Sequence, residues 1–169
     1  MDRSSYRQRR PSGLTLIELL VTLVILALLL GLGVPTLQYL RHATRVQSEV
    51  QRLMTSIVFT RSEAIRRNVR VSMCPSPMAR TGVAACAGSY AGGWIVFENR
   101  DGDRIVDAQD ELIRVYAALP AGFTITNRAG TRAAGNILSY QPDGSSGRTR
   151  TLLVCAPAGS AVPPRSVVL

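Results

Sequence analysis

The chain opens with a polar leader and passes directly into a long apolar run. From Leu14 to Val34 every residue is apolar, glycine or threonine apart from Glu18. This run has about twenty residues, roughly the number that an α-helix needs to cross the hydrocarbon core of a bilayer. The leader carries four arginines and one aspartate, and positive charge of this kind stays on the cytoplasmic side of a membrane. The pattern predicts a transmembrane helix over residues 14–35, with the rest of the chain on the outer side.

Beyond Pro35 the pattern becomes amphipathic. Apolar residues recur at spacings of three or four at Leu40, Ala43, Val46, Val50, Leu53, Ile57, Ala64 and Ile65. Such spacing puts these side chains on one face of an α-helix, and the arginines between them are expected to be solvated. The pattern predicts one helix from about residue 14 to residue 68, whose amphipathic part, 36–68, packs on a domain. Gly31, Gly33 and Pro35 predict a kink or local melting between its two parts.

From Val69 onward the pattern turns to short strands separated by turns. Alternating or compact apolar segments occur at 69–74, 93–98, 111–116, 123–126, 136–140, 151–155 and 166–169. Such segments are typical of β-strands. The segments 119–122 and 141–147 contain proline and glycine and predict turns. A long N-terminal helix followed by short strands predicts an α+β fold, with the helix laid across an antiparallel β-sheet in a domain over residues 69–169.

The segment around Gly13 does not fit an ordinary secretory signal peptide. In a signal peptide, small residues close the apolar segment at the cleavage site, whereas Gly13 stands before the apolar run and Glu18 follows five positions later. The sequence RRPSG followed by LTLIELLV, residues 9–21, resembles the class III leader of type IV pilins and type II secretion pseudopilins. The resemblance implies that a prepilin peptidase removes residues 1–13 and N-methylates the new terminus, Leu14. The family usually has phenylalanine at this position.

Glu18 interrupts the apolar run. A carboxylate within a membrane segment costs about 3 kcal/mol unless it finds a partner. In a helical filament of the kind that the resemblance implies, its natural partner is the freed amine of Leu14 in a neighbouring subunit. The alternative is a carboxylate that snorkels to the interface of a simple membrane anchor. Members of the family also carry a proline at the position of Pro35, and we assign Glu18 and Pro35 to subunit assembly.

Three segments of the remaining chain, 61–68, 93–103 and 140–144, resemble the GspH/FimT branch of this family. That branch contains the minor pseudopilin of type II secretion and minor pilins of type IV pili, some of which bind DNA during uptake. The resemblance implies a single-pass inner-membrane protein with a periplasmic C-terminal domain, which assembles with other pilin subunits into a pilus or pseudopilus. The alternative is a minor pilin that binds double-stranded DNA for natural transformation.

Composition and charge agree with a folded, basic protein. Apolar residues make up 46% of the chain and charged residues 18%, which is unlike a disordered chain. The formal net charge is +9. A basic surface outside the cytoplasm is suited to nucleic acid, anionic lipid or polysaccharide.

The three cysteines leave the disulfide pairing open. Cys74 and Cys86 are close in sequence and could close a loop, since disulfides persist outside the inner membrane. Cys155 lies in an apolar run and could instead pair with either of them or be a buried thiol. Three thiols and the distant His42 are too few ligands for a convincing zinc site.

The acidic turn over residues 99–107 raises the question of calcium. With Gly102 as the sixth residue of an EF-hand loop, Phe97 would be first and Ala108 twelfth, and neither side chain supplies the required oxygen. A glycine-centred turn with solvated acids is therefore favoured. The minor alternative is a looser cation site formed by three carboxylates, Asp101, Asp103 and Asp107.

The segment Gly147-Arg148-Thr149-Arg150 is the candidate for a nucleic-acid contact. Two arginines at alternate positions could bind two phosphates. DNA-binding members of the branch carry a Gly-Arg-x-Arg motif in the C-terminal tail, whereas here it precedes the predicted strand 151–155. The alternative is an exposed hairpin whose arginines keep a sheet edge soluble.

Catalytic patterns are lacking in the sequence. His42 is the only histidine, and neither a Gly-x-Ser-x-Gly motif nor a phosphate-binding loop occurs. The cysteines have a structural use and no paired histidine that would activate a thiol nucleophile. We therefore predict that the protein is not an enzyme and needs no cofactor.

Overall fold

The structure, a computed structural model, describes residues 13, 15–103, 105–147 and 149–169. The chain divides into two compact units, one that ends at Gln38 and one over Tyr39–Leu169. Helix α1 (Leu16–Arg67) begins in the first unit and ends in the second. The backbone remains helical through Pro35, so the local melting that was one of two expectations there does not occur.

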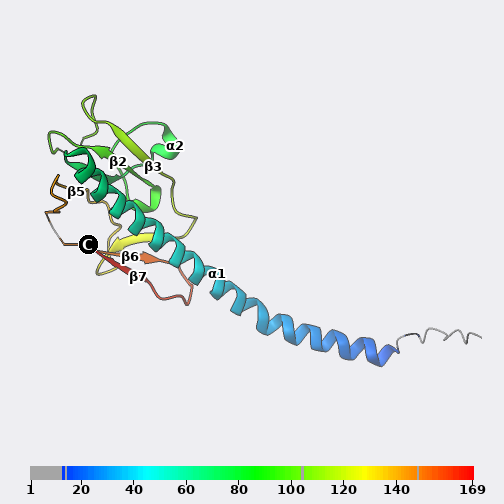
Figure 1. Cartoon of the computed structure of the whole chain (residues 1–169). Coiled ribbons are helices and arrows are strands. Elements are labelled where there is room, and N and C mark those ends of the chain that lie inside the picture. The colour runs from blue at the N-terminus through cyan, green and yellow to red at the C-terminus, as the bar shows by residue number, and fades with distance from the viewer. Residues whose placement is uncertain (1–12, 14, 104, 148) are drawn as a thin grey trace, which may run out of the picture. The chain divides into compact units, whose positions relative to one another are not determined.

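The second unit contains the strands (Figure 1). Their bounds are Val71–Pro75 for β1, Trp94–Glu98 for β2, Leu112–Tyr116 for β3, Thr124–Asn127 for β4, Leu138–Tyr140 for β5, Thr151–Cys155 for β6 and Arg165–Val168 for β7. Two short helices, α2 (Met78–Thr81) and η1 (Tyr90–Gly92), lie between β1 and β2. Each predicted strand is present within two residues at either end, and the predicted α+β class is confirmed.

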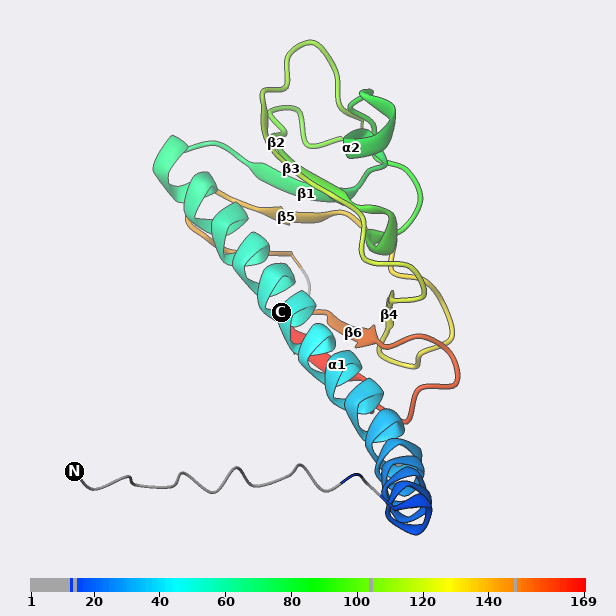
Figure 2. The ribbon, with the colours of Figure 1, turned by 90° about the vertical axis from the view of Figure 1, so that its right-hand side faces the viewer.

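The strands do not form one sheet. Among the residues described, a four-stranded antiparallel sheet has the order β3-β2-β1-β5 and a three-stranded antiparallel sheet has the order β4-β6-β7. The chain therefore leaves the first sheet after β3, returns for β5 and leaves it again. Figure 2 shows the first sheet beside the C-terminal turns of α1 and the second sheet beside the turns before them.

One face of α1 packs on both sheets. Val46, Leu53, Ile57 and Ala64 are buried in one apolar cluster with residues of β1, β2, β4 and β6. Their spacing of seven, four and seven places them on a narrow stripe of the helix. The predicted stripe is broader than this face, because Leu40 and Ile65 are 56% and 51% exposed.

The last turn of α1 is joined to the first sheet by charged side chains. Arg67 donates to Glu63 at 2.7 Å and to Glu98 of β2 at 2.8 Å, and it lies 3.0 Å from Glu111. Hydrogen bonds from the arginines hold the pKa of Glu98 and that of Glu63 below their usual range, the largest effects coming from Arg67 and Arg66 respectively.

A second arginine of α1 also faces the protein. Arg52 pairs with the buried Glu49 at 3.0 Å and donates to the carbonyl of Ala117. Its guanidinium lies 4.6 Å from the ring centroid of Trp94, which stacks on Tyr116 at 5.3 Å. Arg52 is thus an exception to the expectation that the arginines between the apolar positions are solvated, because it meets a buried carboxylate beside the apolar stripe.

Candidate functional site

The first turn of α1 is closed by a reciprocal pair of hydrogen bonds. The backbone N–H of Glu18 donates to the Thr15 hydroxyl at 3.3 Å, and the backbone N–H of Thr15 donates to the Glu18 carboxylate at 3.4 Å. This is a capping box, which satisfies two of the backbone donors that a helix N-terminus leaves without partners. The negative charge also lies where the helix dipole favours it.

The sequence contains a signal for this cap that the prediction for Glu18 misses. Thr-x-x-Glu before an apolar run is a capping-box pattern, whereas the prediction names only a partner in a neighbouring subunit. Gly13 of the predicted cleavage site is exposed, and Leu14 lies outside the described residues. The pairing of Glu18 with a neighbouring Leu14 and the role of Pro35 in assembly stay predictions.

The apolar part of α1 is uncovered. From Leu16 to Leu30 every large apolar side chain is about half exposed or more, from 49% at Val21 to 76% at Leu16. Among the residues described, α1 is also the helix that is long and apolar enough to cross a membrane. A surface of this extent has to be covered by lipid or by other protein chains, because water contact with so much apolar area is unfavourable.

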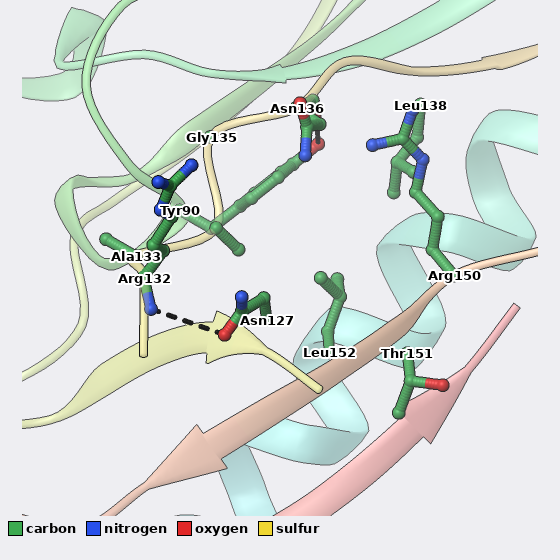
Figure 3. Close-up of a pocket in the computed structure, with 11 residues that line it drawn as sticks. Tyr90, Asn127, Arg132, Ala133, Gly135, Asn136, Leu138, Arg150, Thr151 and Leu152 are labelled. Atoms are coloured by element: carbon green, nitrogen blue, oxygen red, sulfur yellow. Dashed lines mark hydrogen bonds between the residues drawn. The ribbon is translucent and has the colours of Figure 1, made fainter. Parts of the chain in front are cut away.

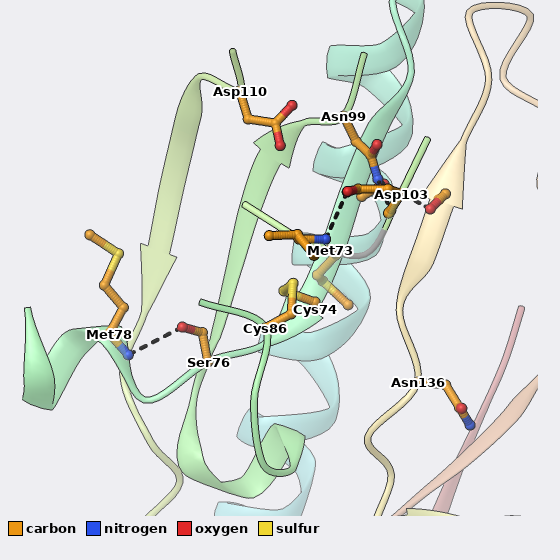
Figure 4. Close-up of a disulfide and its surroundings, with 12 residues drawn as sticks. Met73, Cys74, Ser76, Met78, Cys86, Asn99, Asp103, Asp110 and Asn136 are labelled. Carbon is orange, nitrogen blue, oxygen red and sulfur yellow. Dashed lines mark hydrogen bonds between the residues drawn. A yellow bond between two sulfur atoms is a disulfide. The ribbon is translucent and has the colours of Figure 1, made fainter. Parts of the chain in front are cut away.

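The structure joins Cys74 of β1 to Cys86 in a disulfide, with the Cα atoms 5.5 Å apart (Figure 4). The bond closes the loop that contains α2 and packs it against a small apolar cluster with Ile95 and Phe97. Cys155 is a free thiol, 3.9 Å from the Thr126 hydroxyl. In the folded chain Cys155 therefore pairs with neither Cys74 nor Cys86.

The carboxylates of the acidic turn bind their own backbone. Asp101 accepts from the N–H of Asp103 at 3.1 Å, Asp103 from that of Ile105 at 2.7 Å, and Asp107 from that of Gln109 at 2.8 Å. In the described part of the chain, no group of three or more acidic, histidine or cysteine side chains is placed to hold a metal ion. The structure therefore does not group Asp101, Asp103 and Asp107 into the looser cation site, and each carboxylate instead closes a local turn.

The buried Asn99 anchors this turn to the first sheet. Its side-chain amide donates to the Ser72 hydroxyl at 2.9 Å. It also donates to the carbonyl of Asp103 at 2.8 Å, and Figure 4 shows these two residues side by side. Since Ser72 also shares a 2.7 Å hydrogen bond with Ser139 of β5, the turn, β1 and β5 form one connected polar network. Its role is structural.

Arg150 of the candidate nucleic-acid motif lines a cavity of about 580 Å³ between the two sheets (Figure 3). Arg148 lies outside the described residues. The basic partner that the fold brings to Arg150 in this cavity is Arg132, from the loop after β4. Sequence reasoning missed Arg132, because it stands eighteen positions away from Arg150 and no local pattern relates the two.

Comparisons with known proteins agree with this arrangement. The family model for the type II transport protein GspH matches residues 49–169, and that for the prokaryotic N-terminal methylation motif matches residues 8–34. The pilin-like protein PilA1 of Thermus thermophilus is 30% identical over 158 residues, which cover 93% of this chain and 92% of PilA1. The type IV minor pilin FimU of Pseudomonas aeruginosa shares the fold, with a TM-score of 0.51 at 15% identity over 74% of this chain and 81% of FimU.

Proposed function

This chain belongs to the GspH family of type II transport proteins, and we propose that it serves as a structural, non-enzymatic minor subunit joined to its neighbours through the first half of α1. The filament is a type IV pilus or a type II secretion pseudopilus. The observation that carries this proposal is the uncovered apolar surface from Leu16 to Leu30, whose first turn contains the carboxylate of Glu18. Helices of neighbouring subunits would cover this surface in the filament, and lipid would cover it before assembly.

Processing prepares the N-terminus for assembly. The methylation motif over residues 8–34 supports cleavage after Gly13 by a prepilin peptidase, which frees the amine of Leu14 and methylates it. A carboxylate has two oxygens and accepts several hydrogen bonds. Glu18 can therefore keep its bond to the Thr15 N–H and still accept one from the Leu14 amine of a neighbouring subunit. The helix cap holds the carboxylate at the end of the helix, where that amine would arrive.

The proposed orientation has the leader in the cytoplasm and the second unit in the periplasm. Two observations support it. The leader carries four arginines, which favour the cytoplasmic side, and the Cys74–Cys86 disulfide belongs to an oxidising compartment.

The proposal is tested by neutralising Glu18. In cells that assemble the filament, Glu18→Gln should leave the protein in the membrane fraction and reduce its amount in sheared filaments at least tenfold, measured by immunoblot. Thr22→Val is the matched control, because the Thr22 hydroxyl donates to the carbonyl of Leu19 in its own helix and carries no charge. Filaments that contain the Glu18→Gln protein at the normal level would refute assembly through this carboxylate. Deletion of the gene distinguishes the two machines. Loss of surface pili would indicate a type IV pilus, and loss of secreted enzymes would indicate a type II secretion pseudopilus.

A second candidate function is the binding of double-stranded DNA. It rests on Arg150, whose half-buried side chain forms no ion pair with any residue that the structure describes. A free guanidinium beside a sheet can contact a phosphate. Together with Arg148 it would supply two such contacts.

A further inference from the structure

The charged side chains that the structure describes along the cavity between the two sheets are both arginines. Arg132 and Arg150 lie on either side of Tyr90 and Leu152 (Figure 3). None of the described residues that line it carries a carboxylate, and its remaining polar groups are amides and hydroxyls, from Asn127, Asn136 and Thr151 among others. The cavity therefore presents two positive charges and neutral hydrogen-bonding groups.

Both arginines stand on backbone that the fold holds firmly. The side-chain Oδ1 of Asn127 accepts from the backbone N–H groups of Thr131 at 3.0 Å and Arg132 at 3.3 Å, and the backbone N–H of Asn127 donates to the carbonyl of Arg132 at 2.9 Å. Arg150 exchanges two backbone hydrogen bonds with Leu169, at 3.3 and 2.8 Å, just before β6. Hydrogen bonds thus hold the backbone from which each of the two side chains extends.

Neither guanidinium has a side-chain hydrogen bond or ion pair within the described part of the chain. Elsewhere in this protein the arginines near buried carboxylates, such as Arg52 and Arg67, are paired. Tyr90 does not neutralise the cavity either. Its buried hydroxyl lies 3.0 Å from the carbonyl of Met73 and 2.9 Å from that of Asn136, and burial raises its pKa, so it stays protonated.

We propose that this cavity binds a phosphomonoester group on a molecule of about nucleotide size. A phosphomonoester carries a charge near −2 at neutral pH, which matches two guanidinium groups better than a carboxylate does, and the arginine fork fits phosphate oxygens. The volume of about 580 Å³ is larger than one phosphate requires and lies within the usual range for small-molecule sites. The side-chain amide of Asn136 also lines the cavity and is available to the rest of the ligand. This binding is independent of filament assembly.

The test measures, by isothermal titration calorimetry, the binding of adenosine monophosphate to the full-length chain in detergent micelles and phosphate-free buffer. We expect one saturable site, competition by inorganic phosphate and no binding of adenosine. Arg132→Gln and Arg150→Gln should each weaken binding about tenfold or more, because each removes a charge-assisted contact. Arg128→Gln is the matched control, since this exposed arginine lies in the same loop but does not line the cavity.

Three results would overturn the proposal: no saturable binding, equal binding of adenosine, or an equal loss in Arg128→Gln. A circular dichroism spectrum like that of the parent chain shows that a variant which loses binding is still folded. A further arm compares a 5′-phosphorylated with a 5′-hydroxyl oligonucleotide. Tighter, Arg132-dependent binding of the phosphorylated form identifies a polymer end as a source of the group, and binding of the mononucleotide alone identifies a free small molecule.

Discussion

Arg67 donates a hydrogen bond to Glu98 at 2.8 Å and thereby ties the last turn of α1 to β2. The Glu98 side chain is 5% exposed, so this charge pair is largely removed from water. The same guanidinium also reaches Glu63 of its own helix. One arginine therefore fixes where the helix ends relative to the sheet.

Replacing Arg67 should destabilise the second unit more than replacing its neighbour. In Arg67→Ala, Glu63 and Glu98 keep Arg66 and Arg100 but lose their shared partner, so we expect a loss of about 2 kcal/mol, below the full cost of breaking a buried pair. That corresponds to a fall in Tm of about 5 °C or more. Arg66→Ala is the control, because Arg66 is 65% exposed and its replacement should lower the Tm less. Equal melting temperatures of the two variants would contradict the prediction.

The free energy of unfolding should decrease at acidic pH, because Glu63 and Glu98 become protonated. Because the folded pKa values of Glu63 and Glu98 lie below normal, their contribution is complete above the unfolded pKa of about 4.3 and is lost as pH falls through the folded values. Thermal melts should thus be nearly constant from pH 7 to about pH 5 and decline below about pH 4. The decline should be shallower in Glu98→Gln than in the parent chain. An unchanged slope in that variant would assign the acid sensitivity to other groups.

The Cys74–Cys86 disulfide should make the thermal stability of the second unit sensitive to reductant. Cys86→Ser opens a loop with a sequence separation of 12, and closure of a loop of this size is worth about 3 kcal/mol in the chain-entropy description. Reductant should lower the Tm of the parent chain and leave that of Cys86→Ser unchanged. Cys155→Ser should remain as sensitive to reductant as the parent, because Cys155 is a free thiol. Loss of sensitivity in Cys155→Ser would mean that another pairing operates in solution.

The DNA hypothesis makes a prediction about salt as well as affinity. Replacing Arg148 and Arg150 together by glutamine should weaken binding of duplex DNA and reduce the slope of log K against log salt by about 2, since each phosphate contact contributes about 0.9. A mobility-shift assay of the full-length chain at several salt concentrations measures both. A variant in which Arg128 and Arg165 are replaced instead is the control of equal charge. If the two variants lose affinity equally, the motif has no special role.

The local architecture could be predicted because its signals lie within short stretches of chain. The apolar run, the three-to-four spacing of the amphipathic part and the alternation of the strands each reflect the geometry of one helix or strand. The strand 151–155 is recovered without error for this reason. The capping box at Thr15 and Glu18 belongs to the same class, since its two residues are three positions apart.

By itself the sequence determined the order and type of the elements, the leader motif and the apolar first half of α1, because local backbone preferences and side-chain periodicity decide these. Only the tertiary structure decided that the strands divide into two sheets, that Ser72 meets Ser139, that Cys155 stays free and that Arg132 shares a cavity with Arg150. These contacts join residues far apart in the chain. They follow from which strand edges and apolar faces meet when the whole chain packs, and no short stretch contains that information.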